Sequence, residues 1–169
     1  ELYEKRGDYK LAYDFYFKAS KIIPELNDEF QKAEMWGNMG SVLTHLHKFS
    51  EAYGYLVEGL DFFKILNAHD KIVEGCHKMA YYFIETKNYE SADYYLGLAL
   101  SKSQDINSSF DIGKTHYLKG LLERKDLKTA RSHFEKAIKI FVETKNFYEL
   151  ALANYELANI LYEETDWQQ

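Results

Sequence analysis

The apolar residues of this chain recur with the spacing of amphipathic helices. The clearest stretch places apolar side chains at intervals of three and four, which is one face of a helix: Met35, Met39, Val42, Leu43 and Leu46. One proline and nine glycines in 169 residues are few turn formers, which favours helices over strands. The pattern predicts helices over residues 10–23, 28–47, 51–66, 70–86, 90–103 and 127–143, with further helical faces at 3–6, 117–121 and 154–161.

Three residues give expected helix ends. Asp8 and Ser50 have side chains that accept hydrogen bonds from the free N–H groups of a first helical turn, so both are expected N-caps. Pro24 cannot continue a helix and is expected to stop the one before it.

A small residue recurs at a nearly fixed offset. Ala12, Ala52, Ala92 and Ala130 each begin Ala-x3-(Tyr, Leu or Phe)-x2-(Ala or Gly), at separations of 40, 40 and 38 residues. Such a period is typical of a solenoid in which small residues let paired helices approach closely. Together with the segment 36–40, Trp-Gly-Asn-Met-Gly, the pattern resembles the tetratricopeptide repeat, a two-helix hairpin.

We therefore expect an all-α chain, a right-handed superhelix of tetratricopeptide hairpins with a period of about 40 residues. Residues 1–169 should form a single solenoid with repeats at 1–27, 28–67, 68–107, 108–147 and 148–169, the first and last incomplete. Repeat four is the least regular, with Gly120 out of register and a tighter turn around Lys125 and Asp126. A fragment of this kind should leave an apolar face at its end, at Leu161, Tyr162 and Trp167.

Charge and cysteine content narrow the class of partner. A net charge of −6 argues against nucleic-acid binding by this segment, because phosphate contacts need clustered Lys and Arg. The single cysteine, Cys76, allows no internal disulfide and occupies an apolar repeat position, so we expect a buried core thiol. No apolar run is long enough to span a membrane. A reducing cytoplasm is the expected compartment.

The first helix of each repeat should line the concave side of the superhelix, where solenoids commonly bind. Polar positions on that side are the candidate peptide-binding residues: Glu34, Asn38, Ser41, His45, His77, Tyr81, Glu85, Lys119, Tyr155 and Asn159. An Asn carboxamide both donates and accepts hydrogen bonds, so Asn38 and Asn159 suit a peptide backbone. The alternative is an ordinary solvated helix face, which for any single position is the more common case.

The sequence offers little for catalysis or metal binding. The six histidines have no zinc-like spacing, and we expect neither a metal nor another cofactor. No Gly-rich phosphate loop, nucleophile elbow or His-Glu-x-x-His is present, so the chain is not expected to be an enzyme.

The long period makes the resemblance specific to a smaller group of repeat proteins. Residues 28–34, Asp-Glu-Phe-Gln-Lys-Ala-Glu, leading into the segment at 36–40, resemble the repeats of the Rap, NprR and PlcR group of peptide-sensing regulators of Gram-positive bacteria. The resemblance implies a groove that holds a short peptide, whose binding shifts the superhelix or its oligomeric state. Effector domains of that group, including the phosphatase residues of Rap proteins, have no counterpart in this sequence.

Two functions from different classes remain open at this point. The first is a peptide-binding module, the ligand-sensing domain of a cytoplasmic signalling or transcriptional regulator, with a possible homodimer through the terminal repeats. The second is a constitutive scaffold for assembling protein complexes, since eukaryotic scaffolds of the LGN and kinesin-light-chain type share the long period.

Overall fold

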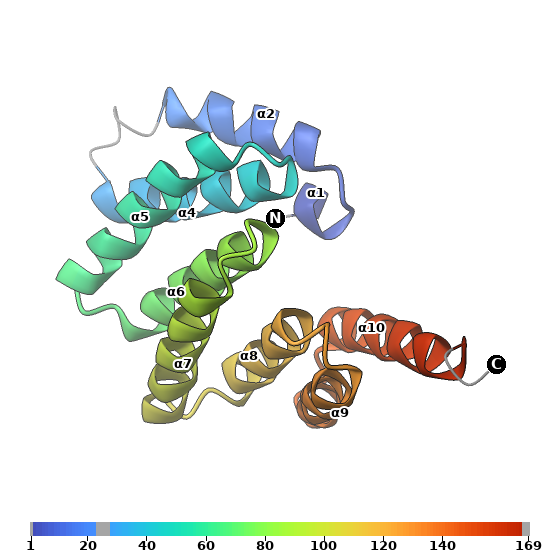
Figure 1. The fold of residues 1–169 in the computed structure, drawn as a ribbon. Coiled ribbons are helices and arrows are strands. Elements are labelled where there is room, and N and C mark those ends of the chain that lie inside the picture. The colour runs from blue at the N-terminus through green and yellow to red at the C-terminus, as the bar shows by residue number, and fades with distance from the viewer. Residues whose placement is uncertain (1, 23–27, 167–169) are drawn as a thin grey trace.

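The computed structural model describes residues 2–22 and 28–166, and every regular element in them is a helix (Figure 1). The helices are α1 (Leu2–Lys5), α2 (Tyr9–Ser20), α4 (Glu29–His45), α5 (Phe49–Ile65), α6 (His69–Glu85), α7 (Tyr89–Asp105), α8 (Ser109–Leu122), α9 (Leu127–Glu143) and α10 (Phe147–Asp166). Pro24 and Trp167 lie outside the described residues. No helix in the described ranges is long and apolar enough to cross a membrane.

Neighbouring helices form antiparallel hairpins that stack side by side. The pairs α4 and α5, α6 and α7, and α8 and α9 pack most extensively, and α10 packs on α9. The hairpins follow a curve from α1 and α2 through α6 and α7 to α9 and α10, so that α1 and α10 lie on the same side of the molecule (Figure 1). The prediction of an all-α helical-repeat solenoid is confirmed.

The four repeat alanines occupy equivalent positions in the core. Ala12 is 2 % exposed, and Ala52, Ala92 and Ala130 are fully buried. Larger side chains from both neighbours fill the space between hairpins; one such core joins α4 to α7 through Leu56, Leu60, Phe63, Val73, Cys76 and Met79. Cys76 is buried as expected, and burial raises the pKa of its thiol to about 11.

Most connections between helices use one residue in the left-handed backbone region. Within the described residues these are Gly7, His47, Asn67, Lys87, Asn107 and Lys145, with φ between 52° and 76°. The next residue donates its N–H to a carbonyl five positions earlier, as Asn88 does to Phe83 at 2.9 Å. This is the Schellman arrangement, which satisfies the last carbonyls of a helix and favours glycine at the left-handed position.

Replacing Lys87 with glycine is expected to raise the free energy of unfolding by about 0.5–1 kcal/mol. The φ of Lys87 is 61°, a conformation that is strained for a residue with a Cβ and unstrained for glycine. Its side chain is exposed, so little packing is lost. Urea unfolding measures the change; Lys139→Gly, in the exposed middle of α9, is the control and should lower stability by about 1 kcal/mol. A loss of stability at both positions would contradict the strain argument.

One predicted helix start is wrong by two residues. The helix expected to follow a Ser50 cap begins at Phe49, with Lys48 at the N-cap and no side-chain hydrogen bond. Because His47 takes the left-handed position, the turn is complete two residues before Ser50, which becomes helical. Asp8 does stand at the N-cap of α2, but its side chain makes no capping bond.

Gly120 is in register, contrary to the prediction. Residues 40, 80 and 120 are Gly, Ala and Gly, 40 positions apart, and all three are buried. Each faces the second helix of its own hairpin: a Cβ on Gly40 would lie 2.6 Å from Leu56, and one on Gly120 would lie 2.6 Å from Phe134. The irregularity is in the turn, because α8 ends early at Leu122 and Asp126 caps α9. That shortening explains the 38-residue separation of Ala92 and Ala130.

Candidate functional site

A cavity of about 430 Å³ lies on the inner side of the solenoid and is lined from every hairpin. Its lining comes from the first helix of each pair, with Tyr9 added from the start of α2: Glu4, Lys5, Tyr9, Ser41, His45, His77, Lys78, Tyr81, Lys114, Tyr117, Leu118, Tyr148, Glu149 and Leu152. The ammonium of Lys5 lies 5.8 Å from the ring centre of Tyr148, which brings α1 into contact with α10. We call this cavity the inner groove. Its volume falls in the range of about 300–1,000 Å³ usual for ligand pockets.

Aromatic rings form a ladder along one wall of the inner groove. Tyr9 stacks on His45 with ring centres 4.1 Å apart, and His45 lies against Tyr81 at 4.7 Å. The Tyr81 hydroxyl is 3.2 Å from Nδ1 of His45. Tyr117 continues the series, since positions 9, 45, 81 and 117 are 36 residues apart. Burial raises the pKa of both Tyr81 and Tyr117, so their hydroxyls stay protonated and can donate.

A chain of ion pairs joins the second hairpin to the third beside the groove. Lys71 pairs with Glu34 and, at 3.2 Å, with Glu74. Lys78 donates to Glu74 and to the side-chain oxygen of Asn38, both at 2.7 Å. Burial alone would raise the pKa of Glu74, but the two ammonium groups outweigh it and lower the pKa to about 2. Glu34 and Asn38 are therefore tied to α6.

The hydrogen bonds around His77 favour one tautomer of its ring. The Thr115 hydroxyl donates to the carbonyl of Asp111 at 2.8 Å, so its oxygen accepts from Nε2 of His77, also at 2.8 Å. Nδ1 is then an acceptor; it is buried and has no hydrogen bond within the described part of the chain. Burial, with the nearby Lys114 ammonium, holds the pKa of His77 well below its usual range. His77 is thus a neutral, 1 % exposed residue under the groove floor.

Nitrogen NMR is expected to show His77 as the Nε2–H tautomer, with no titration between about pH 8 and pH 6. Replacing Thr115 with valine removes the acceptor of a buried N–H and should lower the free energy of unfolding by about 1–3 kcal/mol. The exposed Thr165→Val is the control and should be close to neutral. An Nδ1–H signal for His77, or a neutral Thr115→Val, would contradict the assigned hydrogen bonds.

Several predicted residues meet in the inner groove and others lie apart from it. Ser41, His45, His77 and Tyr81 line it, Glu85 borders Tyr81, and Glu34 and Asn38 stand in the adjoining ion-pair chain. Lys119 pairs instead with Asp93 of α7 at 3.2 Å. Tyr155, 65 % exposed, and Asn159 lie on α10 and are not among the lining residues.

Three of the lining residues that the sequence analysis did not identify share one signal. Tyr9 precedes His45 by 36 residues, and Tyr117 and Lys114 follow Tyr81 and Lys78 by the same interval. This offset is four residues shorter than the 40-residue repeat, and four residues are about one turn of a helix. Groove positions therefore shift back by one turn in each hairpin, and a search at 36 residues would have found these side chains.

Two histidines that are 17 positions apart in sequence face each other in space. Nδ1 of His116 in α8 lies 3.2 Å from Nδ1 of His133 in α9. Burial and the nearby lysines lower the pKa of His133. The pKa of His116 is lowered to about 4 by burial, by the neighbouring His133 and by the same lysines. The pair is therefore neutral near pH 7.

Neither a family model nor a curated protein matches this chain. Among solved structures, a Rap protein complexed with competence and sporulation factor matches with a TM-score of 0.90 and 24 % identity. The apo form of RapI matches with a TM-score of 0.69 and 22 % identity. Each match covers 99 % of this chain and 47 % of the other, so the chain spans about half the length of these proteins. The chain therefore has the all-α, tetratricopeptide-type repeat fold of the Rap proteins.

Proposed function

We propose that this chain is a peptide-binding repeat domain, the ligand-sensing part of a bacterial signalling or transcriptional regulator that acts in the cytoplasm. The observation that carries the proposal is the inner groove, to which the four described hairpins and α10 contribute side chains. Its volume of about 430 Å³ suits a segment of a few residues. The matching Rap protein is described in complex with competence and sporulation factor, which supports a ligand-binding role for this fold.

The mechanism follows from the position of the groove. A ligand that contacts α1, α6 and α10 at once links hairpins from both ends of the curve. Because such a ligand binds one curvature better than another, it shifts the superhelix towards that curvature. Asn38, Glu85 and the aromatic ladder are the proposed contacts. We propose no nucleic-acid contact for this chain; a homodimer through the terminal repeats would transmit the same change.

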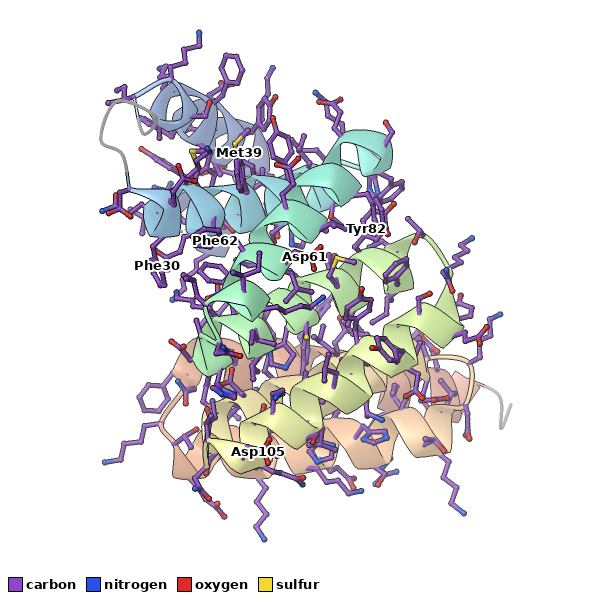
Figure 2. The ribbon with its side chains drawn as sticks, turned by 90° about the vertical axis from the view of Figure 1, so that its left-hand side faces the viewer. Phe30, Met39, Asp61, Phe62, Tyr82 and Asp105 are labelled. Carbon is purple, nitrogen blue, oxygen red and sulfur yellow. The ribbon has the colours of Figure 1, made fainter. Side chains whose placement is uncertain are left out.

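An outer aromatic cluster favours the alternative, a scaffold for protein assembly. It comprises Phe49, Tyr53, Tyr82, Phe83, Tyr94 and Tyr95, whose ring centres follow one another at 5.2–6.3 Å across α5, α6 and α7. Figure 2 views this outer side, with Tyr82 beside α5. Exposed Tyr is common where proteins dock.

Affinity selection distinguishes the two functions. The chain is incubated with random pentapeptides, passed through size exclusion, and the retained peptides are identified by mass spectrometry. A peptide sensor retains a defined subset, which Tyr81→Ala in the groove abolishes and Tyr94→Ala on the outer cluster preserves. Calorimetry with the retained peptides then gives Kd values. If the wild-type chain retains no peptide, the proposed peptide-sensing function is wrong and the scaffold function is favoured.

A further inference from the structure

One cation of the inner groove has no counterion. Lys114 lines the groove and is half-buried, yet it makes no hydrogen bond or ion pair with any residue that the structure describes. The other ammonium on this wall, Lys78, is satisfied by Glu74 and Asn38, each at 2.7 Å. An ammonium removed from water without a partner is costly, so Lys114 is held in an unfavourable state in the ligand-free chain.

Two of the three acidic groups around Lys114, Glu74 and Asp111, interact with other residues. Glu74 is held by Lys71 and Lys78. Asp111 lies in the first turn of α8, where its carboxylate accepts from the hydroxyl of the N-cap Ser108 at 2.6 Å. Glu149 lines the same groove but forms no ion pair with Lys114 within the described ranges. Burial lowers the pKa of Lys114 and the Lys78 ammonium adds to this, whereas the carboxylates of Glu74, Asp111 and Glu149 act in the opposite direction. Within the described ranges, none of these carboxylates forms an ion pair with Lys114.

We infer that Lys114 receives a carboxylate of the groove's ligand, which supplies the missing counterion. This inference rests on the proposed function and adds its ligand chemistry. The hydroxyls of Tyr117 and Tyr81 are further donors in the groove, because each tyrosine follows a lysine, Lys114 or Lys78, by three positions on its helix. A carboxylate takes several donors at once, and a charge-assisted bond in a partly dry groove is stronger than a neutral one.

Carboxylates contributed to the groove by other helices give the ligand a direction. Glu4 and Glu149 come from α1 and α10, and they line the groove with Tyr9 and Tyr148. A segment with a carboxylate at Lys114 and a cationic group towards Glu149 complements both charges. Two sources can supply the carboxylate: the C-terminus of a free peptide, or an Asp or Glu side chain within it.

The test uses four pools of random pentapeptides. Two carry a free C-terminal carboxylate and two are C-terminally amidated; within each type, one pool contains Asp and Glu and the other lacks both. Retention of the free-acid pool without Asp and Glu assigns the C-terminus to Lys114. Retention restricted to pools with Asp and Glu, whether or not amidated, assigns a side-chain carboxylate.

Variants at Lys114 connect the carboxylate to this residue. Lys114→Met should lower the affinity for the retained peptides by about tenfold or more, and Lys114→Arg should restore most of it. The exposed Lys139→Met is the control. Without ligand, Lys114→Met should unfold at the same temperature as wild type or a higher one, because the lost charge has no partner. Equal retention of the amidated pool without Asp and Glu, or unchanged affinity in Lys114→Met, overturns the inference and leaves peptide binding intact. If the wild type retains no pool, the proposed function fails, and this inference fails with it.

Discussion

Replacing Gly120 with alanine is expected to lower the free energy of unfolding by about 1–3 kcal/mol. A Cβ at this position would lie 2.6 Å from Cε1 and 2.7 Å from Cζ of Phe134, far inside van der Waals contact. Phe134 is fully buried, with Ala130 and Ile160 in the same core cluster. A rigid ring enclosed in this way cannot withdraw, so the added methyl must move α8 away from α9.

The third hairpin supplies the compensating change. There the equivalent pair is Ala80 and Leu96, both fully buried in one cluster. Transplanting this pair as Gly120→Ala with Phe134→Leu should therefore cost less than the sum of the two single changes, by about 1 kcal/mol or more. Urea unfolding of the four proteins measures the coupling. Strict additivity would show that the two helices separate freely, and would contradict close packing at Gly120.

Gly120 also shows which parts of the fold the sequence could predict and which it could not. Helix type and pairing were predictable, because apolar spacing and small residues report on packing within a few turns of helix. The register of Gly120 was not, because the alanine series counts along the chain through a turn that is two residues shorter. Counting from Gly40 and Ala80 instead would have placed Gly120 correctly.

The candidate groove was predictable in part for a related reason. Carrying positions forward by a full repeat found His45 and Tyr81, which do line the groove, but it also selected Lys119, which turns towards Asp93. A superhelix rotates each hairpin against the last, so inner positions drift by a helical turn per repeat. Ion pairs between repeats, such as Lys78 with Asn38, depend on side-chain reach and leave no pattern in one sequence.

Lowering the pH from 7 to 5 is expected to reduce the free energy of unfolding by about 2 kcal/mol or more. Burial lowers the pKa of His45, His77, His116 and His133 in the folded chain, that of His116 to about 4. An unfolded histidine titrates near pH 6.5, so below that pH the unfolded chain takes up protons that the folded chain excludes. The stability is complete above about pH 6.5 and is lost as the pH falls towards the folded pKa values. Each such histidine can contribute at most about 1.4 kcal/mol per pH unit, and the partly exposed ones less.

The facing pair His116 and His133 should account for a measurable share of this loss. Protonating either ring places a charge beside its neighbour and near Lys119 and Lys136, whose charges lower the pKa of both histidines. His116→Asn with His133→Asn should therefore lose less stability between pH 7 and pH 5 than wild type, whereas the exposed His69→Asn should lose as much. Urea unfolding at the two pH values gives the difference for each protein. Glu74, with a pKa of about 2, stays ionised throughout this window and cannot produce the effect. The fall in net negative charge acts on all three proteins alike, so the comparison isolates the contribution of the two histidines. An equal loss of stability in all three proteins would show that groups outside this pair cause the acid sensitivity.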